Sequence, residues 1–419
     1  MSNPKQYLLC VIACLVSSNL AVSQAIPDSL LPAQEFSARG GLPNFSAKIA
    51  AGKSIRIAFL GGSITRAGGG YRDQVLSWFK NQYPASQFTE IMAAVSGTGS
   101  DFGACRVEQQ VINYAPDLVF VEFAVNDNRT PMQKVRETME GIVRQIWKRK
   151  PFTDICFIYT FSAENLPLLQ KKIFPSSVSA MEAIAAAYNI PSIHMGLSVA
   201  DEIKQGKLLM AGKREEQAAV PLFSLDGVHP LPETGHKMYT SVLSKYLLLL
   251  SHNATAAKHR LPKAVETENW SNAGMAGLSG RKIKFKGDWH TVDSVTKGRE
   301  YYQLQPQVYS TASADASLTV QFSGTRFGLA DIMGPSTAAI EVSIDNQAPG
   351  VINRFDAFST YYRLNYFIIR NLPGGKHTAT VRLAPVKIDK EAILKTRNVI
   401  VNDKSAYQAA VLYIGAVLY

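Results

Sequence analysis

Between residues 54 and 251 the sequence alternates between short apolar runs and longer amphipathic segments, and this alternation constrains the fold more than any other feature. Residues 118–123 are almost wholly apolar, as expected of a strand buried on both faces. Residues 132–148 carry an apolar stripe at helical spacing. We expect strands at 54–60, 88–95, 117–125, 155–161 and 192–195, and helices at 71–82, through Val107 and Ile112, and at 132–148, 179–188 and 234–250. This order predicts βαβ units, a parallel sheet and helices on both of its faces.

Beyond about residue 282 the pattern changes to short strands separated by turns. Asp345-Asn346 and Pro373-Gly374-Gly375 are typical turn sequences. The strands that we expect there lie at 318–322, 339–344, 366–370, 378–383 and 409–418. We therefore predict a flavodoxin-like, three-layer α/β/α domain over residues 26–252, a linker over 253–281, and an all-β sandwich of the jelly-roll kind over 282–419.

Residues 1–25 have the pattern of a secretory signal peptide. Lys5 supplies the positive charge, residues 7–16 form the apolar core, and Ser23-Gln24-Ala25 fits a cleavage site. The apolar run is too short to cross a bilayer as a helix. Residues 11–14 resemble a lipoprotein box, so a lipid anchor at Cys14 is an alternative to plain secretion. We expect an exported protein, secreted or periplasmic.

Charge and cysteine content exclude several classes of function. The net charge is +11, but no dense basic run is present, so we expect no nucleic-acid partner. Histidine and cysteine spacings typical of metal sites are also missing, and we expect neither metal nor cofactor. Removal of the signal peptide leaves Cys105 and Cys156, which either form one disulfide or pack separately.

A serine follows the first apolar run, at Gly61-Gly62-Ser63. A phosphate-binding loop would need a lysine after such glycines, and a dinucleotide site would need a different glycine spacing. Neither pattern is present. Ser63 is therefore either the N-cap of the following helix or a nucleophile whose hydroxyl is presented by a sharp turn.

A serine nucleophile needs a base, and His229 is the best candidate. Asp226 precedes it by three residues and could hold the imidazole ring and stabilise its charged form. His236 is a rival, but it lies in a predicted helix and has no aspartate three residues before it. Ser63, Asp226 and His229 are thus the predicted catalytic residues.

Acyl transfer also needs donors for the oxyanion. The second predicted strand is followed by Gly97, whose backbone N–H is unobstructed, and the third by Asn126, whose amide can donate. Asn126 and Asp127 could instead form only an Asx turn. Reactive groups collect beyond the carboxyl ends of strands in open α/β sheets, which favours the catalytic interpretation.

These residues resemble the SGNH, or GDSL, hydrolase superfamily over about residues 55–250. Ser63, Gly97 and Asn126 match the first three motif blocks of that family, and Asp226 and His229 match the last. The resemblance implies an oxyanion hole formed by Ser63, Gly97 and Asn126. Two positions depart from the family pattern, since Gly62 replaces an aspartate and Ala124 replaces a glycine.

The resemblance and the loops together suggest a substrate. The loops that follow the predicted strands are small, polar and glycine-rich, which suits a short acyl group on a polar alcohol. Exported enzymes that combine a similar domain with a β-sandwich often deacetylate glycans. We therefore expect a serine esterase that acts on acylated small molecules or polysaccharides, most of all a carbohydrate O-acetylesterase. The alternatives are a lipase, a thioesterase, a glycan methylesterase, an acyltransferase and a non-catalytic glycan-binding protein.

Aromatic residues of the predicted sandwich either bind sugar rings or belong to its core. They are Trp289, Tyr301, Tyr302, Tyr361, Tyr362 and Tyr366.

Overall fold

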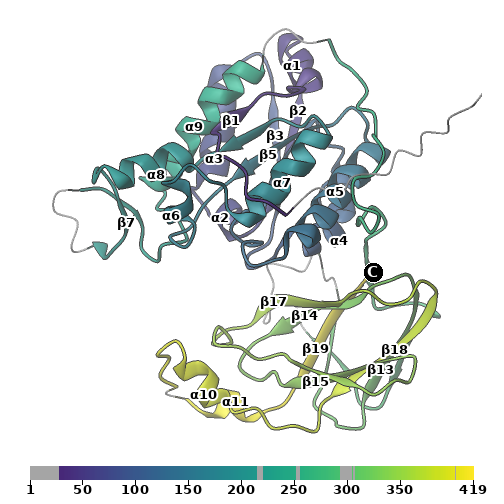
Figure 1. The fold of residues 1–419 in the computed structure, drawn as a ribbon. Coiled ribbons are helices and arrows are strands. Elements are labelled where there is room, and N and C mark those ends of the chain that lie inside the picture. Colours follow the sequence, from purple (N-terminus) through teal and green to yellow (C-terminus); the bar gives the residue numbers. More distant parts are fainter. Residues whose placement is uncertain (1–27, 215–219, 252–254, 293–303, 305–306, 402) are drawn as a thin grey trace, which may run out of the picture.

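The computed structural model describes residues 28–214, 220–251, 255–292, 304, 307–401 and 403–419. The expected signal peptide, Cys14, Tyr301 and Tyr302 lie outside these residues. The chain forms an α/β domain followed by a domain of antiparallel sheets, which confirms the predicted fold class (Figure 1).

The α/β domain is built on a six-stranded sheet. In spatial order its strands are β1 (Phe36–Ser37), β6 (Ser192–His194), β5 (Asp154–Tyr159), β4 (Leu118–Glu122), β2 (Ile55–Gly61) and β3 (Phe88–Ala94). All neighbours pair in parallel except β1, which adds an antiparallel edge. Without β1, the order is that of the flavodoxin-like doubly wound fold, with its switch point between β2 and β4.

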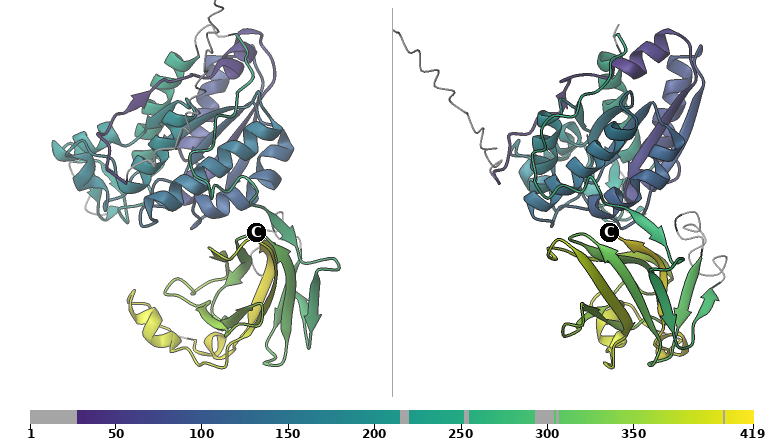
Figure 2. Two further views of the ribbon diagram at one scale, coloured as in Figure 1. Left: turned by 45° about the vertical axis from the view of Figure 1, so that its right-hand side comes forward. Right: turned by 90° about the vertical axis from the view of Figure 1, so that its right-hand side faces the viewer.

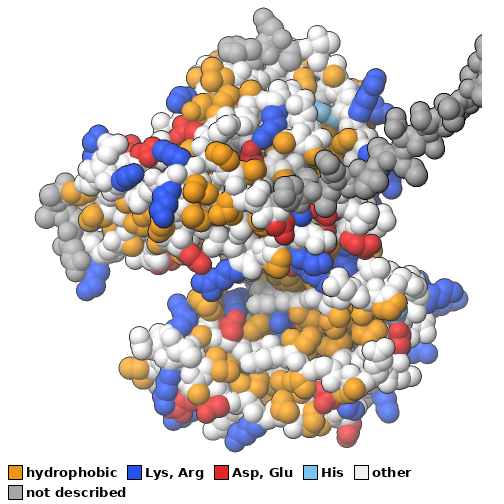
Figure 3. All heavy atoms as spheres, viewed as in Figure 1, with side chains coloured by type: hydrophobic (Ala, Val, Ile, Leu, Met, Phe, Trp, Pro, Cys, Tyr) orange, Lys and Arg blue, Asp and Glu red, His pale blue; other side chains and the backbone are white. Residues whose placement is uncertain are grey.

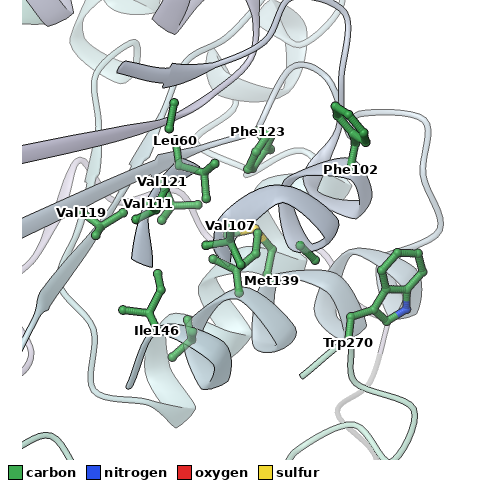
Figure 4. Packing of buried hydrophobic residues seen from close by; sticks show 14 of the residues in the cluster. Leu60, Phe102, Val107, Val111, Val119, Val121, Phe123, Met139, Ile146 and Trp270 are labelled. Carbon is green, nitrogen blue, oxygen red and sulfur yellow. The ribbon is translucent and has the colours of Figure 1, made fainter. Parts of the chain in front are cut away.

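Helices cover both faces of this sheet. Successive residues of β2 point to opposite faces, so Phe59 joins the cluster that includes Phe79 and Leu243, whereas Leu60 joins the cluster with Met139 (Figure 4). The first cluster packs under α1 (Pro43–Ala50), α3 (Tyr71–Gln82) and α9 (Gly235–Leu250). The second packs under α4 (Ser100–Gln110), α5 (Met132–Arg149) and α7 (Ser176–Ala187). Shorter elements are α2 (Ser63–Arg66), η1 (Ile112–Tyr114), α6 (Leu166–Leu169), α8 (Leu197–Lys204), β7 (Leu209–Ala211) and β8 (Leu222–Ser224).

The second domain packs two antiparallel sheets against each other (Figure 2). One sheet contains β10 (Ile283–Lys286), β13 (Ser317–Ser323), β18 (Lys376–Leu383), β15 (Ala339–Ile344) and β16 (Gly350–Asn353). The other contains β11 (His290–Val292), β12 (Val308–Thr311), β19 (Leu412–Leu418), β14 (Phe327–Met333) and β17 (Arg363–Ile369), with β9 (Met275–Gly277) beside β19. Leu318 and Ile340 from the first sheet share one apolar core with Leu329 and Ile414 from the second.

Strand β14 was not expected from the sequence, although all of its residues are buried. Asp331 interrupts its apolar pattern, and the structure shows why a charge is tolerated there. The Arg354 guanidinium donates to both carboxylate oxygens of Asp331, at 2.6 and 2.7 Å. Two short helices, α10 (Lys390–Lys395) and α11 (Ser405–Gln408), were likewise not expected, and the last strand begins at Leu412 rather than at residue 409.

The polar stretch expected to act as a linker packs along the α/β domain. Trp270 is only 1% exposed and its backbone N–H donates to the carbonyl of Glu137 on α5. The fit against Gly141 of the same helix is close, because a Cβ there would lie 2.6 Å from Trp270 Cβ. This segment thus runs over α5 before it reaches β9 at the waist between the two domains, which is visible in Figure 3.

Both remaining cysteines are free and buried. Cys105 lies in the cluster on one face of the sheet and Cys156 in the cluster on the other, so they pack separately. Burial raises the pKa of each thiol above its ordinary value. No helix among the described residues is both long and apolar enough to cross a membrane.

Candidate active site

Three loops begin at the same edge of the parallel sheet. Gly61, the last residue of β2, lies opposite Ala94 on β3 and Glu122 on β4. Ser63 follows β2 as the first residue of α2, and we call residues 61–66 the β2–α2 turn. Residues 95–99, here named the β3–α4 loop, contain Gly97, and Asn126 follows β4. The carboxyl ends of three neighbouring strands, β4, β2 and the edge strand β3, thus present all three residues beside the switch point of the fold.

The turn after β8 completes a hydrogen-bonded chain of three side chains. Ser63 Oγ lies 2.9 Å from His229 Nε2, and His229 Nδ1 lies 2.7 Å from Asp226 Oδ2. The helix N-cap is Gly62 rather than Ser63, so the serine hydroxyl is available to the histidine. This is the geometry of a nucleophile, a base and the acid that orients the base.

Asp226 is held by several donors besides the imidazole ring. Its Oδ1 accepts from the backbone N–H groups of Val228 and His229 and from the hydroxyl of Ser224. Gly227 makes the tight turn possible with φ of +76°. Partial burial alone would raise the pKa of Asp226, but these hydrogen bonds outweigh burial and hold the pKa well below its ordinary value. The carboxylate therefore stays ionised wherever a histidine can act as a base.

His236, the rival base, lies in the core. It is 1% exposed, and its Nδ1 accepts a hydrogen bond from the backbone N–H of Tyr71 at 3.0 Å. Burial and then the charge of His229 lower its pKa to about 4. A neutral, buried ring that is already bonded to the backbone cannot serve Ser63 as His229 can.

Gly62 departs from the expected aspartate, and the structure gives a reason. A Cβ at position 62 would lie 2.0 Å from Oδ1 of Asn126, closer than any real contact. The amide of Asn126 therefore packs directly on the backbone that precedes Ser63. Glycine at position 62 allows the third predicted oxyanion donor to approach the nucleophile.

The β3–α4 loop needs two glycines for different reasons. Gly97 has φ of +70°, a left-handed conformation, and nothing lies within 4 Å of the position of a Cβ. Gly99 is tightly packed instead, since a Cβ would lie 2.4 Å from Oδ1 of Asp127. The same carboxylate accepts from the backbone N–H of Ser100 at 3.1 Å. Asp127 therefore supports the loop that carries Gly97.

A buried polar network below the site was not predicted from the sequence. Glu122 is 1% exposed and accepts from the hydroxyls of Thr160 and Thr65 and from the backbone N–H of Ala124. Burial raises the pKa of Glu122 against these hydrogen bonds. The network connects the β2–α2 turn to the segment that leads to Asn126. A glutamate within the apolar run at 118–123 was the available signal for it.

The triad is open to solvent. The side chains of His229 and Asp226 are 50% and 53% exposed. Among the described residues, no group of three or more His, Cys, Asp or Glu side chains is placed to hold a metal ion.

Three of the aromatic side chains of the second domain have contacts of their own. Trp289 packs on Phe285, Tyr362 bonds to Ser336, and Tyr366 reaches the α/β domain. Tyr361 is exposed.

Comparison with known proteins agrees with this architecture. A model of the GDSL-like lipase/acylhydrolase family matches residues 59–236. Among solved structures, a two-domain esterase active on acetylated mannans, co-crystallized with mannopentaose, has a TM-score of 0.73 and 21% identity, covering 93% of this chain and 98% of that chain. A second structure of a two-domain esterase active on acetylated mannans gives a TM-score of 0.71 at 21% identity, covering 93% and 97%.

A search of curated proteins found no match. The structural likeness concerns the fold and extends through both domains, whereas the family match lies within the α/β domain. By that match, the α/β domain is similar to the GDSL-like lipase/acylhydrolase family.

Proposed function

We propose that this protein is an exported serine esterase that removes short acyl groups, acetyl above all, from carbohydrate. The observation that carries the proposal is the chain from Ser63 Oγ to His229 Nε2 at 2.9 Å and from His229 Nδ1 to Asp226 Oδ2 at 2.7 Å. Gly97 and Asn126, which follow neighbouring strands at the same edge of the sheet, are the proposed oxyanion donors. Export is proposed from the signal-peptide pattern of residues 1–25.

In the proposed acylation step, Ser63 Oγ forms a bond to the ester carbonyl carbon while His229 Nε2 takes the hydroxyl proton. Negative charge then develops on the carbonyl oxygen, which the N–H groups of Ser63 and Gly97 and the amide of Asn126 are proposed to bind. Asp226 holds the ring through Nδ1 and stabilises the imidazolium. The tetrahedral intermediate collapses, His229 gives the proton to the departing alcohol, and an acyl-serine remains.

Deacylation repeats these roles with water. His229 accepts a proton from the water molecule, whose oxygen attacks the acyl carbonyl, and then returns the proton to Ser63 Oγ as the bond to the serine breaks. The products are the free acid and the original enzyme. Apart from the ester and the water molecule, no group outside the protein takes part in the balance of atoms or protons.

Two observations support a carbohydrate ester as the substrate. The triad is half exposed, so an ester on a polymer can reach Ser63 without entering an enclosed pocket. The chain is also similar through both domains to an esterase that is active on acetylated mannans. Acetylated polysaccharides are therefore the first substrates to test.

The test is acetate release from acetylated polysaccharides by the wild-type protein and by Ser63→Ala. The exposed Ser77 on α3 provides a matched control, and Ser77→Ala should behave as wild type. We expect release that falls by at least about 10⁴-fold in Ser63→Ala. Activity only on long acyl esters would favour a lipase or thioesterase, and methanol release would favour a methylesterase. Acyl transfer to an acceptor alcohol would identify a transferase, and no turnover of any ester would contradict the proposal.

Asp226→Asn separates the orienting role of the aspartate from the rest of the site. The asparagine oxygen can still accept from the backbone N–H groups of the turn, but the amide cannot fix the His229 tautomer that has its proton on Nδ1. We therefore expect kcat to fall by roughly 10⁴-fold. Thermal unfolding of the variant should stay close to that of the wild type. Full activity in Asp226→Asn would exclude the proposed triad.

A further inference from the structure

The second domain contacts the β3–α4 loop through one tyrosine. Tyr366 on β17 donates from its hydroxyl to Asp101 Oδ1 at 2.6 Å. The same hydroxyl oxygen accepts from the backbone N–H of Gly99 at 3.3 Å. Gly99 lies two residues after Gly97, and Asp101 is in the first turn of α4. A single side chain of the β-sandwich thus bonds to both ends of the segment that enters this helix.

Arg370, which follows β17, makes the second contact. Its Nη2 donates to Asp101 Oδ2 at 2.8 Å, and both side chains are about four-fifths buried. The two oxygens of Asp101 are therefore each bonded to a different residue of the second domain. Charge-assisted hydrogen bonds of this kind are short and strong when they are shielded from water.

Ring stacking fixes the tyrosine itself. The Tyr366 ring lies over the Phe102 ring with a centroid distance of 4.7 Å and an interplanar angle of 15°. Phe102 is fully buried on α4, so the position of the hydroxyl is set by a packed core. Removal of the hydroxyl alone would leave this stacking in place.

Residues of the α/β domain also hold the start of α4, on the side away from Tyr366. Asp127 accepts from the N–H of Ser100, and the Ser100 hydroxyl lies 2.6 Å from the hydroxyl of Thr138 on α5. The β3–α4 loop is therefore held between Asp127 of its own domain and Tyr366 of the other. Gly97 has no side chain of its own, so its N–H is oriented by the residues around it: the Thr98 hydroxyl bonds to the Val95 carbonyl at 2.8 Å within the loop, and the contacts of Gly99 and Ser100 hold its far end.

We propose that Tyr366 and Arg370 are positioning residues of the esterase site: they hold Gly99 and Asp101, and thereby aim the Gly97 N–H at the oxyanion. This inference rests on the proposed function. It makes the β-sandwich a structural part of the catalytic site, whether or not that domain also binds carbohydrate. Oxyanion donors act only within a narrow range of distance, so a small displacement of the loop lowers the rate without removing any reacting group.

The decisive variant is Tyr366→Phe, which keeps the ring and loses the hydroxyl. With p-nitrophenyl acetate, a substrate too small to need a glycan-binding surface, we expect kcat to fall roughly ten- to a hundredfold. The KM should stay within about twofold and the melting temperature should stay near that of the wild type. Tyr362→Phe is the matched control, because its hydroxyl bonds to Ser336 within the second domain, and it should retain the wild-type kcat.

Substitutions of Arg370 test separately whether the charged contact with Asp101 contributes to kcat. Arg370→Gln should lower kcat, whereas Arg370→Lys should restore part of it, since lysine can still donate to Asp101. Combined with Asp101→Ala, the effect of Tyr366→Phe should be smaller than in the wild-type background, because one of the two hydrogen bonds of the Tyr366 hydroxyl is already lost. Wild-type kcat in Tyr366→Phe, or an equal loss in Tyr362→Phe, would overturn the inference.

Failure of the proposed function gives a different result. In that case the wild type and Ser63→Ala would hydrolyse p-nitrophenyl acetate equally, and no acetate would be released from glycans. An active wild type with an inactive Ser63→Ala and an unaffected Tyr366→Phe would reject only the role of the second domain.

Discussion

The β2–α2 turn and the β3–α4 loop lie at one edge of the sheet, but they are held in place by different parts of the molecule. In the turn, Thr65 bonds to Glu122 and to Tyr71, all within the α/β domain. The loop depends on Asp127 from its own domain and on Tyr366 from the other. The nucleophile is thus supported locally, whereas the predicted oxyanion donor Gly97 depends on how the two domains meet.

The buried carboxyl groups that support the two regions also differ in what shifts their pKa. Burial raises the pKa of Glu122 below the turn against the hydrogen bonds from two hydroxyls, whereas Asp127 also has the charge of Asp101 nearby. Burial and then the charge of Asp101 raise the pKa of Asp127 from 3.8 to about 7, against the hydrogen bonds from Ser100. Support of the loop is therefore sensitive to pH near neutrality.

The largest effect on stability that we expect follows from this raised pKa. Below about pH 4, Asp127 is protonated in both the folded and the unfolded chain. As the pH rises, the unfolded chain loses the proton first and the folded protein keeps it until about pH 7. The free energy of unfolding should therefore fall by roughly 4 kcal/mol over this interval because of this one group.

Asp127→Asn should remove this contribution. Measured by urea unfolding at several pH values, the stability of the variant relative to the wild type should rise from pH 4 to pH 7. Parallel pH profiles for the two proteins would show that Asp127 does not titrate in this range, and that the loop is held by an ordinary ionised carboxylate.

The next effect tests how tightly the β2–α2 turn is packed. Gly62→Ala places a Cβ 2.0 Å from the amide oxygen of Asn126, so the amide must move away from the nucleophile. Loss of one oxyanion donor lowers kcat by about 10²- to 10³-fold, and we expect a loss near the lower value.

Gly68→Ala is the control for Gly62→Ala, because nothing lies within 4 Å of a Cβ at position 68. It should retain the wild-type kcat on p-nitrophenyl acetate. If Gly62→Ala is as active as Gly68→Ala, then Asn126 is not a donor to the oxyanion.

The residues that the sequence could predict are those that carry their signal in short, local patterns. The alternation of strands and helices predicted the parallel sheet and its helical layers, and the order of Ser63, Gly97, Asn126, Asp226 and His229 along it predicted which strand ends would meet. Strand pairing then places Ser63, Gly97 and Asn126 together, since the carboxyl ends of parallel strands share one edge. Asp226 and His229 reach them from the turn after β8, which belongs to a separate two-stranded sheet.

The remaining features depend on contacts between residues far apart in the chain. Tyr366 and Asp101 are 265 positions apart, and no local pattern connects an aromatic residue in a strand to a helix in another domain. Strand β14 was missed because Asp331 interrupts its apolar run, and the Arg354 that compensates the charge lies outside that strand. Such pairs become visible only when the fold brings them together.

The smallest effect concerns Gly97 itself and separates backbone conformation from packing. Gly97 has φ of +70°, and nothing lies within 4 Å of the position of a Cβ. Gly97→Ala should therefore lower the free energy of unfolding by about 1 kcal/mol through left-handed strain, while the backbone N–H remains in place. Gly206 has φ of +72° and equally open surroundings after α8, so Gly206→Ala should lose similar stability with no change in kcat.

For Gly97→Ala we expect a decrease in kcat of less than about tenfold, well below that of Gly62→Ala, because no reacting group is displaced by a clash. A loss as large as that of Gly62→Ala would mean that the backbone of the β3–α4 loop cannot shift without loss of activity. The contacts of Asp127 and Tyr366 would then hold the loop more rigidly than packing holds the β2–α2 turn.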